Sequence, residues 1–281
     1  MPKSRLDALL FSRALSPSRE QARRLIMAGQ VTVNGALMDK PGMMIREDAQ
    51  LAVTALPRFV SRGGEKLDAA LGRFGLDVAS LICADVGAST GGFADCLLQR
   101  GAAKVYAIDV GHGILAWKLR NDPRVVVMEK TNARYVERLP ERIGLVTIDA
   151  SFISLKLLLP VVKNWLNPSP LTPFPPGEGP AVRAIITLIK PQFEAGRKEV
   201  GKGGVVRDPE VHRRVLHGIL DFAGDEGLAV KGLMPSPLVG PKGNVEFLAW
   251  YGLGGNSTNW IADVEAALSE AAARNREAIP T

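Results

Sequence analysis

The sequence predicts an α/β protein whose mostly parallel sheet has helices on both faces and follows a small N-terminal α+β unit. Two observations predict this class. Short apolar strands alternate with helices through most of the chain, a pattern typical of parallel sheets. With 281 residues, of which 46% are hydrophobic and 23% charged, the chain can bury one large core and a small second one.

The first unit is predicted from a short series of helix, turn and strand signals. Apolar residues within 6–13 indicate an amphipathic helix. A second helix should begin after Ser18, which can cap it and is followed three residues later by Gln21, as in a capping box. A short strand at 31–33 then runs into Asn34-Gly35, a signal for a tight turn.

The rest of the chain is predicted as a linker followed by alternating strands and helices. We expect a first domain at 1–55, a linker at 56–65 and a second domain at 66–281. Strands of the sheet are expected at 81–86, 104–109, 125–129, 143–149 and 183–190, with closing antiparallel strands at 228–233 and 245–251. Helices are expected at 66–74, 90–100, 113–120, 154–166, 208–223 and 259–277. The Pro/Gly-rich segment 167–180 is predicted to be a flexible, solvent-exposed insertion without chemistry.

Charge and apolar patterning narrow the class of partner. Residues 1–73 contain 12 bases and 7 acids and so carry +5 of the net charge of +6, which suggests a polyanionic partner for this quarter of the chain. The N-terminus lacks the apolar core of a signal peptide, and no stretch reaches the roughly 18 apolar residues of a membrane span. Cys83 and Cys96 lie in hydrophobic stretches without metal-ligand spacing. We therefore expect a cytoplasmic protein with reduced cysteines, no membrane contact and no metal.

The clearest ligand signal is the segment DVGASTGGF at 85–93, which follows a predicted strand and opens a predicted helix. Glycines at such a place let the backbone turn sharply and let a ligand approach closely. The spacing differs from Gly-x-Gly-x-x-Gly, which argues against a nicotinamide or flavin cofactor, and it suits S-adenosylmethionine. The candidate cofactor-binding residues here are Asp85, Gly87, Ser89, Thr90, Gly91, Gly92 and Phe93.

Polar residues that end the following strands complete the predicted crevice. Asp109 stands roughly 20 residues past the glycine turn, where one carboxylate can accept both ribose hydroxyls. Asn132 is placed to contact the adenine edge, and Asp149 ends the fourth strand. Two simpler explanations stay open, because a glycine turn alone is often only a tight turn and Asn132 could cap the helix that follows it.

Several segments, in order, resemble one known family. They are RFVSRGGEKL at 58–67, DVGASTGGF at 85–93, TIDASFIS at 147–154, LIKPQFE at 188–194 and VGKGGVVRDP at 200–209. Residues 1–55 resemble an S4 RNA-binding domain and the rest resembles the FtsJ-like methyltransferases. Together they resemble the TlyA family of ribosomal RNA 2′-O-methyltransferases, whose members are also called hemolysins. The resemblance implies a Rossmann-like class I S-adenosylmethionine-dependent methyltransferase sheet, and ribosomal RNA or ribosomal subunits as partners.

The resemblance also implies a catalytic tetrad at Lys66, Asp149, Lys190 and Glu246. Asp149 and Lys190 make chemical sense independently, because each ends a predicted strand. A ribose hydroxyl is a poor nucleophile, so Lys190 would act as its base or stabilise the forming alkoxide. Asp149 would orient Lys190, while Lys66 and Glu246 would hold the ribose and the lysine network. Alternatively, Lys66 is a solvated surface charge, Asp149 caps the next helix, and Glu246 is a structural partner of a nearby base.

The S4-like segment supplies the candidate RNA contacts. They are Arg5, Arg13, Arg19, Arg23 and Arg24, side chains that contact phosphates and set position without reading sequence. Arg19 and Arg23 lie four residues apart and should share a helix face. A solvated helix face is the alternative. With three Tyr and four Trp and no aromatic motif for base stacking, recognition of RNA shape is expected.

Other functions compete with this interpretation. A hemolysin or membrane-active protein would need a span or a basic amphipathic membrane helix, and neither is evident. A non-catalytic RNA-binding assembly factor would not need all four tetrad residues. A dehydrogenase would need a different glycine spacing. An S4 domain also accompanies pseudouridine synthases, but a glycine turn followed by Asp109 does not suit an enzyme without a nucleoside cofactor.

Overall fold

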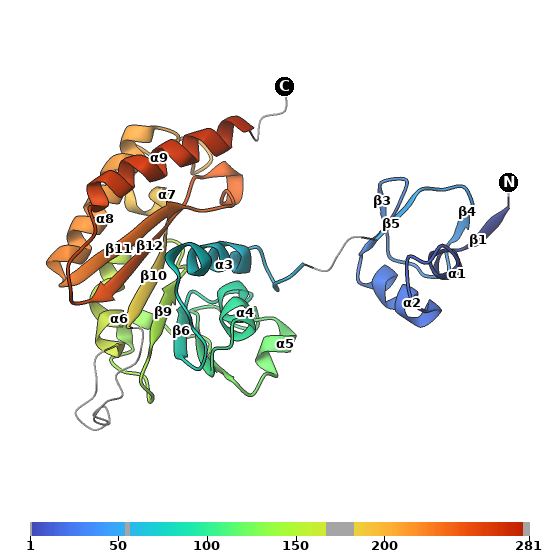
Figure 1. Cartoon of the computed structure of the whole chain (residues 1–281), viewed down its shortest axis with the longest axis horizontal. Coiled ribbons are helices and arrows are strands. Elements are labelled where there is room, and N and C mark those ends of the chain that lie inside the picture. Colours follow the sequence, from blue (N-terminus) through green and yellow to red (C-terminus); the bar gives the residue numbers. More distant parts are fainter. Residues whose placement is uncertain (1, 54–56, 167–182, 278–281) are drawn as a thin grey trace. The chain divides into compact units, whose positions relative to one another are not determined.

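A computed structural model describes residues 2–53, 57–166 and 183–277 (Figure 1). The predicted insertion at 167–180 lies outside the described residues. The chain divides into two compact units, Met1–Arg58 and Phe59–Thr281. Each unit has a hydrophobic core of its own, as the sequence suggested.

The first unit packs two helices against short strands. Its elements are β1 (Lys3–Arg5), α1 (Leu6–Ser12), α2 (Arg19–Met27), β2 (Val31–Val33), β3 (Ala36–Met38), β4 (Met44–Arg46) and β5 (Leu51–Val53). Strand β1 pairs with β4, and β2 lies between β3 and β5, all antiparallel. The predicted cap of α2 is confirmed, because the Ser18 hydroxyl accepts the Gln21 amide at 3.1 Å. The predicted turn is confirmed too, since Asn34 and Gly35 have φ of 50° and 81°.

The second unit is built on one seven-stranded sheet, in the order β11-β12-β10-β9-β6-β7-β8. Its strands are β6 (Ile82–Val86), β7 (Lys104–Ile108), β8 (Val125–Met128), β9 (Leu145–Ile148), β10 (Ala184–Ile189), β11 (Leu228–Pro235) and β12 (Phe247–Leu253). All pairings are parallel except those of β12, which is antiparallel to β10 and β11. The predicted parallel sheet with closing antiparallel strands is therefore confirmed.

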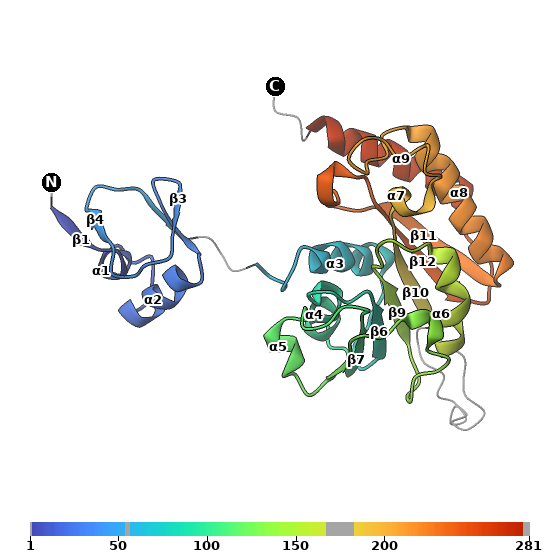
Figure 2. The same ribbon diagram turned by 180° about the vertical axis from the view of Figure 1, so that it is seen from behind.

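Helices cover both faces of this sheet (Figures 1 and 2). One face carries α3 (Gly63–Phe74), α4 (Gly92–Gln99) and α5 (Trp117–Arg120), and the other carries α6 (Leu159–Trp165), α8 (Pro209–Asp225) and α9 (Trp260–Glu277). Successive strand residues point to opposite faces, so Ile185 packs in one core and Ile186 in the other.

Two predicted helices are shorter than expected. The one at 113–120 is only the single turn α5, because Gly113 is in the left-handed region at φ 73° and Asp109 binds the Gly111 amide, which fixes a loop instead. The one at 154–166 splits into a 3-10 turn η2 (Leu155–Leu157) and α6, because Pro160 has no amide hydrogen to continue the helix. The short helix α7 (Pro191–Glu194) was not predicted.

The order of the strands decides where a ligand can bind. The chain runs outward from β6 to β8, then returns to the other side of β6 with β9. Neighbouring parallel strands β6 and β9 thus continue into loops that leave in opposite directions, and such a switch point opens a crevice at the carboxyl ends of the strands.

Candidate active site

The glycine turn after β6 lies at this switch point. Three of its residues have left-handed backbones, with φ of 80° at Gly87, 50° at Ser89 and 94° at Gly91. A Cβ on Gly87 would lie 2.7 Å from the Asp149 carbonyl oxygen, so only glycine lets the ends of β6 and β9 approach this closely. A Cβ on Gly91 would lie 2.2 Å from Leu119, so Gly91 serves the packing of α5 and does not line the crevice.

The carboxyl group of Asp85 fixes the start of α4 beside β9. It is fully buried and accepts the Thr147 hydroxyl and the Ala94 amide, both at 3.0 Å. Burial raises its pKa to about 7. Phe93, another candidate contact, is buried in the core beneath α3 and α4 and forms part of the crevice wall.

Asp109 and Asn132 line one half of the crevice, a cavity of about 400 Å³ that also includes Gly87, Ser89 and Asp149. The Asp109 carboxylate accepts the Ser89 amide at 2.8 Å and the Gly111 amide at 2.6 Å, which holds it at the mouth of the glycine turn. The Asn132 side-chain oxygen accepts the Arg134 amide at 3.1 Å, so the alternative prediction that Asn132 is a helix cap is confirmed for the 3-10 turn at Ala133–Tyr135.

The four predicted tetrad residues line the other half of the crevice as two ion pairs. Lys66 Nζ, from α3, lies 2.5 Å from Glu246 Oε2, which precedes β12. Lys190 Nζ, after β10, lies 2.7 Å from Asp149 Oδ1, after β9, and donates to the Ser151 hydroxyl at 2.9 Å. Two cations and two carboxylates thus meet although 180 residues separate Lys66 from Glu246.

The loop before β12 leaves space for the Glu246 carboxylate. A Cβ on Gly240 would lie only 2.2 Å from Glu246 Oε1. The backbone of Gly240, at φ −67° and ψ 176°, is one that any residue can adopt, so the glycine serves to make room. Glu246 lines the crevice, and its buried Oε1 has no hydrogen-bond partner among the described residues.

An exposed aromatic ring stands beside the lysine–aspartate pair, and sequence reasoning missed it. Phe152 is 90% exposed and has a left-handed backbone with φ 63°, which is costly for a bulky residue and is typical of functional sites. Its ring lies 4.9 Å from the ring of Phe193, over which Lys190 Nζ sits at 5.7 Å. The only sequence signal was its place in TIDASFIS, three residues after Asp149.

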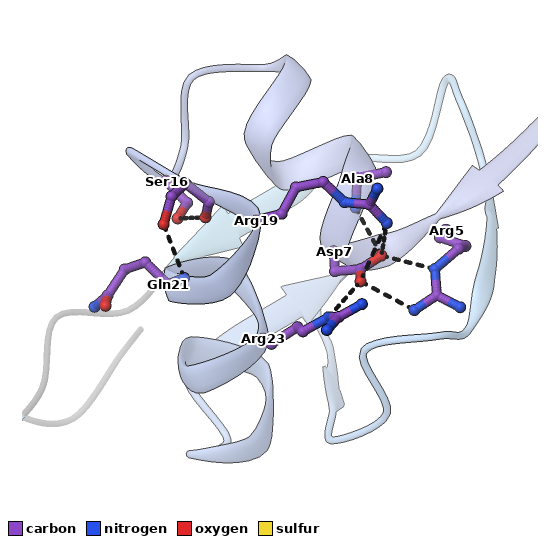
Figure 3. A network of polar contacts seen from close by, with 8 residues as sticks. Arg5, Asp7, Ala8, Ser16, Arg19, Gln21 and Arg23 are labelled. Carbon is purple, nitrogen blue, oxygen red and sulfur yellow. Dashed lines mark hydrogen bonds and ion pairs between the residues drawn. The ribbon is translucent and has the colours of Figure 1, made fainter.

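The five predicted RNA-contacting arginines lie in the first unit and divide into two groups. Arg5, Arg19 and Arg23 share one carboxylate, that of Asp7 (Figure 3). The other two are engaged elsewhere: Arg13 donates to the backbone oxygens of Ala49 and Glu47, and Arg24 pairs with Glu20. The prediction that Arg19 and Arg23 share a helix face is confirmed.

Comparison with known sequences and structures identifies the family. Residues 59–253 match the FtsJ-like methyltransferases and residues 4–51 match the S4 domain. The chain belongs to the FtsJ-like methyltransferases. YqxC, a candidate rRNA methyltransferase of Bacillus subtilis, is 50% identical over 88% of this chain and 84% of its own. The 16S/23S rRNA (cytidine-2′-O)-methyltransferase TlyA of Mycobacterium tuberculosis is 44% identical over 88% of this chain and 89% of its own.

A solved structure resembles this methyltransferase over its whole length. A candidate hemolysin from Streptococcus thermophilus is 41% identical, with a TM-score of 0.72, and covers 99% of this chain and 98% of its own. Among the described residues, no helix is both long and apolar enough to cross a bilayer.

Proposed function

We propose that this protein transfers the methyl group of S-adenosylmethionine to a ribose 2′-hydroxyl of ribosomal RNA. The observation that carries the proposal is the meeting of two lysine–carboxylate pairs in the same crevice as the glycine turn of a methyltransferase. The relatives supply the substrate, because TlyA of Mycobacterium tuberculosis is named for 2′-O-methylation of ribosomal RNA.

The residues around the glycine turn fit the cofactor. Each oxygen of the Asp109 carboxylate accepts one backbone amide and keeps a lone pair for a ribose hydroxyl. The left-handed turn brings Gly87, which has no side chain, and Ser89 to the wall of the cavity. We assign Asp109 to the ribose and Asn132 to the adenine side of the cavity.

The tetrad then acts on the RNA hydroxyl. When bound, S-adenosylmethionine would supply a methyl group already activated by its sulfonium, and the 2′-hydroxyl that receives this group would have to lose its proton. As a neutral amine, Lys190 accepts that proton; as an ammonium, it stabilises the charge that develops on the oxygen while the proton passes to water. Asp149 and Ser151 hold the Lys190 amino group in place, with Nζ at 2.7 and 2.9 Å from their oxygens. The Lys66–Glu246 pair, which lines the same crevice, positions the ribose.

Phe152 is assigned to the target nucleotide. Its exposed ring lies beside Ser151, and aromatic rings stack on bases that have left an RNA helix. This assignment adds a stacking contact that composition did not suggest, while the arginines of the S4 unit supply contacts with the RNA backbone.

The experiment uses purified full-length protein, radiolabelled S-adenosylmethionine, and either ribosomal subunits or naked ribosomal RNA. We expect label in RNA, and its loss in Lys190→Ala. Lys104→Ala is the matched control, because Lys104 pairs with Glu141 at the opposite end of the parallel strands. If no RNA is labelled while the cofactor binds, the protein is a non-catalytic assembly factor. If Lys190→Ala turns over like Lys104→Ala, the assignment of Lys190 is wrong.

A further inference from the structure

In the first unit, three arginines surround one buried carboxylate (Figure 3). Asp7, in the first turn of α1, is fully buried. Arg5 donates to it from Nε and Nη2, both at 3.0 Å, and Arg23 donates from Nε at 3.0 Å. Arg19 Nη2 lies at 3.4 Å. The arginine side chains themselves remain about half exposed, at 45% for Arg5, 50% for Arg19 and 53% for Arg23.

Neutralising Asp7 does not explain this arrangement. The two-pronged contact with Arg5 already balances one buried carboxylate, and it holds the pKa of Asp7 far below its usual range. Arg19 and Arg23 raise the charge of the cluster to +2, and like charges four residues apart on a helix repel each other. A cluster that keeps this excess positive charge at the surface is arranged to bind a second anion.

The geometry leaves donors for that anion. A guanidinium has five N–H donors, whereas Arg19 reaches Asp7 through Nη2 and Arg23 through Nε. Free arginines sample many rotamers, and ordering them on binding costs affinity. Because Asp7 anchors one end of each guanidinium, the remaining donors are ordered in advance. Guanidinium groups bind phosphate through paired N–H donors, and phosphate is the anion that an RNA backbone presents.

A glycine in the facing loop makes room for the cluster. A Cβ on Gly42 would lie 3.2 Å from Nη1 of Arg5 and 3.5 Å from Nη2. Gly42 is not among the residues with a positive φ, so its backbone does not demand glycine. The same loop is fixed to α1, because Asp7 and Leu6 donate their amides to Pro41 and Met43 at 3.1 and 2.9 Å.

We propose that Asp7 is a positioning residue that holds Arg5, Arg19 and Arg23 together as one binding site for a phosphate of the RNA backbone. The inference rests on the proposed function, which supplies the RNA. It separates these three arginines from Arg13, which binds backbone oxygens, and from Arg24, which pairs with the exposed Glu20 and does not contact Asp7.

The decisive variant is Asp7→Asn, because the loss of its negative charge and the loss of its hold on the arginines should change RNA affinity in opposite directions. Removing a negative charge makes the unit more basic, so electrostatics alone predicts tighter RNA binding. Loss of positioning predicts weaker binding, by roughly tenfold, the scale of reordering two long side chains. Asp48→Asn is the matched control, since Asp48 lies in the same unit and binds Arg46 at the surface in the same two-pronged way.

Binding of 16S and 23S ribosomal RNA transcripts would be measured with the full-length protein at moderate salt. Circular dichroism and thermal unfolding would show that each variant is folded. We expect Asp7→Asn to bind RNA more weakly than the wild type, and Asp48→Asn to bind at least as tightly. Gly42→Ala, which shifts Arg5 without changing charge, should weaken binding by about twofold and tests the idea even if Asp7→Asn fails to fold.

Two results would overturn the inference. A folded Asp7→Asn that binds as tightly as Asp48→Asn would mean that Asp7 only stabilises the fold. Unchanged binding by an Arg19→Glu and Arg23→Glu double variant would mean that no phosphate site exists here. Neither result touches the proposed function, which fails only if methyl transfer to ribosomal RNA is absent.

Discussion

Gly240→Ala tests the catalytic geometry without altering a charged residue. The backbone of Gly240 already suits alanine, so the change adds one methyl group and no backbone strain. That methyl would lie 2.2 Å from Oε1 of Glu246, which must retreat by roughly 1 Å to reach a normal contact. Glu246 is buried and paired with Lys66, so Lys66 must shift with it.

A misplacement of about 1 Å in a positioning group costs on the order of a hundredfold in turnover. We therefore expect kcat for methyl transfer to RNA to fall by about that factor, while affinity for S-adenosylmethionine is unchanged. The assay is single-turnover methylation with saturating RNA, beside calorimetric titration of the cofactor.

Gly224→Ala serves as the control for this variant. Gly224 lies in α8, where an added Cβ has no neighbour within 4 Å, so alanine should stabilise the helix and leave activity intact. A folded Gly240→Ala with the kcat of Gly224→Ala would refute the idea that the position of Glu246 matters for catalysis.

Three further variants test separate parts of the site. Lys66→Met should lower the free energy of unfolding by about 3 kcal/mol, because it leaves Glu246 buried and unpaired. Adding Glu246→Gln should recover most of that stability without recovering activity. Denaturant titration of the single and double variants measures both effects. Phe152→Ala should lower kcat/KM for RNA by roughly five- to a hundredfold, the range expected for losing one base–aromatic stack, and should leave cofactor affinity unchanged. A kcat/KM equal to that of the wild type would show that Phe152 does not contact the RNA. Asp85 has its pKa raised to about 7 when folded, so the folded protein holds this proton more tightly than the unfolded chain. The stability that this provides below about pH 4 is lost as pH rises through about 7, and Asp85→Asn should flatten that part of the stability–pH curve in denaturant titrations at several pH values.

The sheet was predictable because its signals are local. Strand β10 is a run of six buried residues, and the cap at Ser18 and the turn at Asn34-Gly35 need only adjacent residues. The helices that were predicted too long failed for reasons that are not local. Whether 113–120 continues as a helix depends on the carboxylate of Asp109 binding the Gly111 amide, a contact that periodicity does not encode.

In the candidate site, too, the residues with local sequence signals were predicted more firmly than those that depend on long-range packing. The ends of β9 and β10 placed Asp149 and Lys190 side by side, because neighbouring parallel strands end at one edge of the sheet. The strand signal that placed Glu246 was weak, and its contact with Lys66 arises only when α3 packs across the end of β12. Phe152 could not be found from composition, because its importance lies in exposure and a left-handed backbone, two properties that only coordinates reveal.

The two charged clusters differ in a way that matches their proposed tasks. The tetrad contains two ammonium groups and two carboxylates, so it is neutral as a set and exerts little long-range attraction on RNA. The cluster around Asp7 gathers three guanidinium groups on one carboxylate and keeps a net charge of +2 at the surface. A neutral site suits catalysis, because each cation is held in place by a carboxylate. The ribose hydroxyl is uncharged, so it can enter without replacing either carboxylate as the partner of a lysine. A cationic surface suits capture, since every phosphate it neutralises releases counterions. We therefore expect the cluster in the S4 unit to contribute mainly to RNA affinity, and the ion pairs of the methyltransferase unit to contribute mainly to positioning the reacting groups.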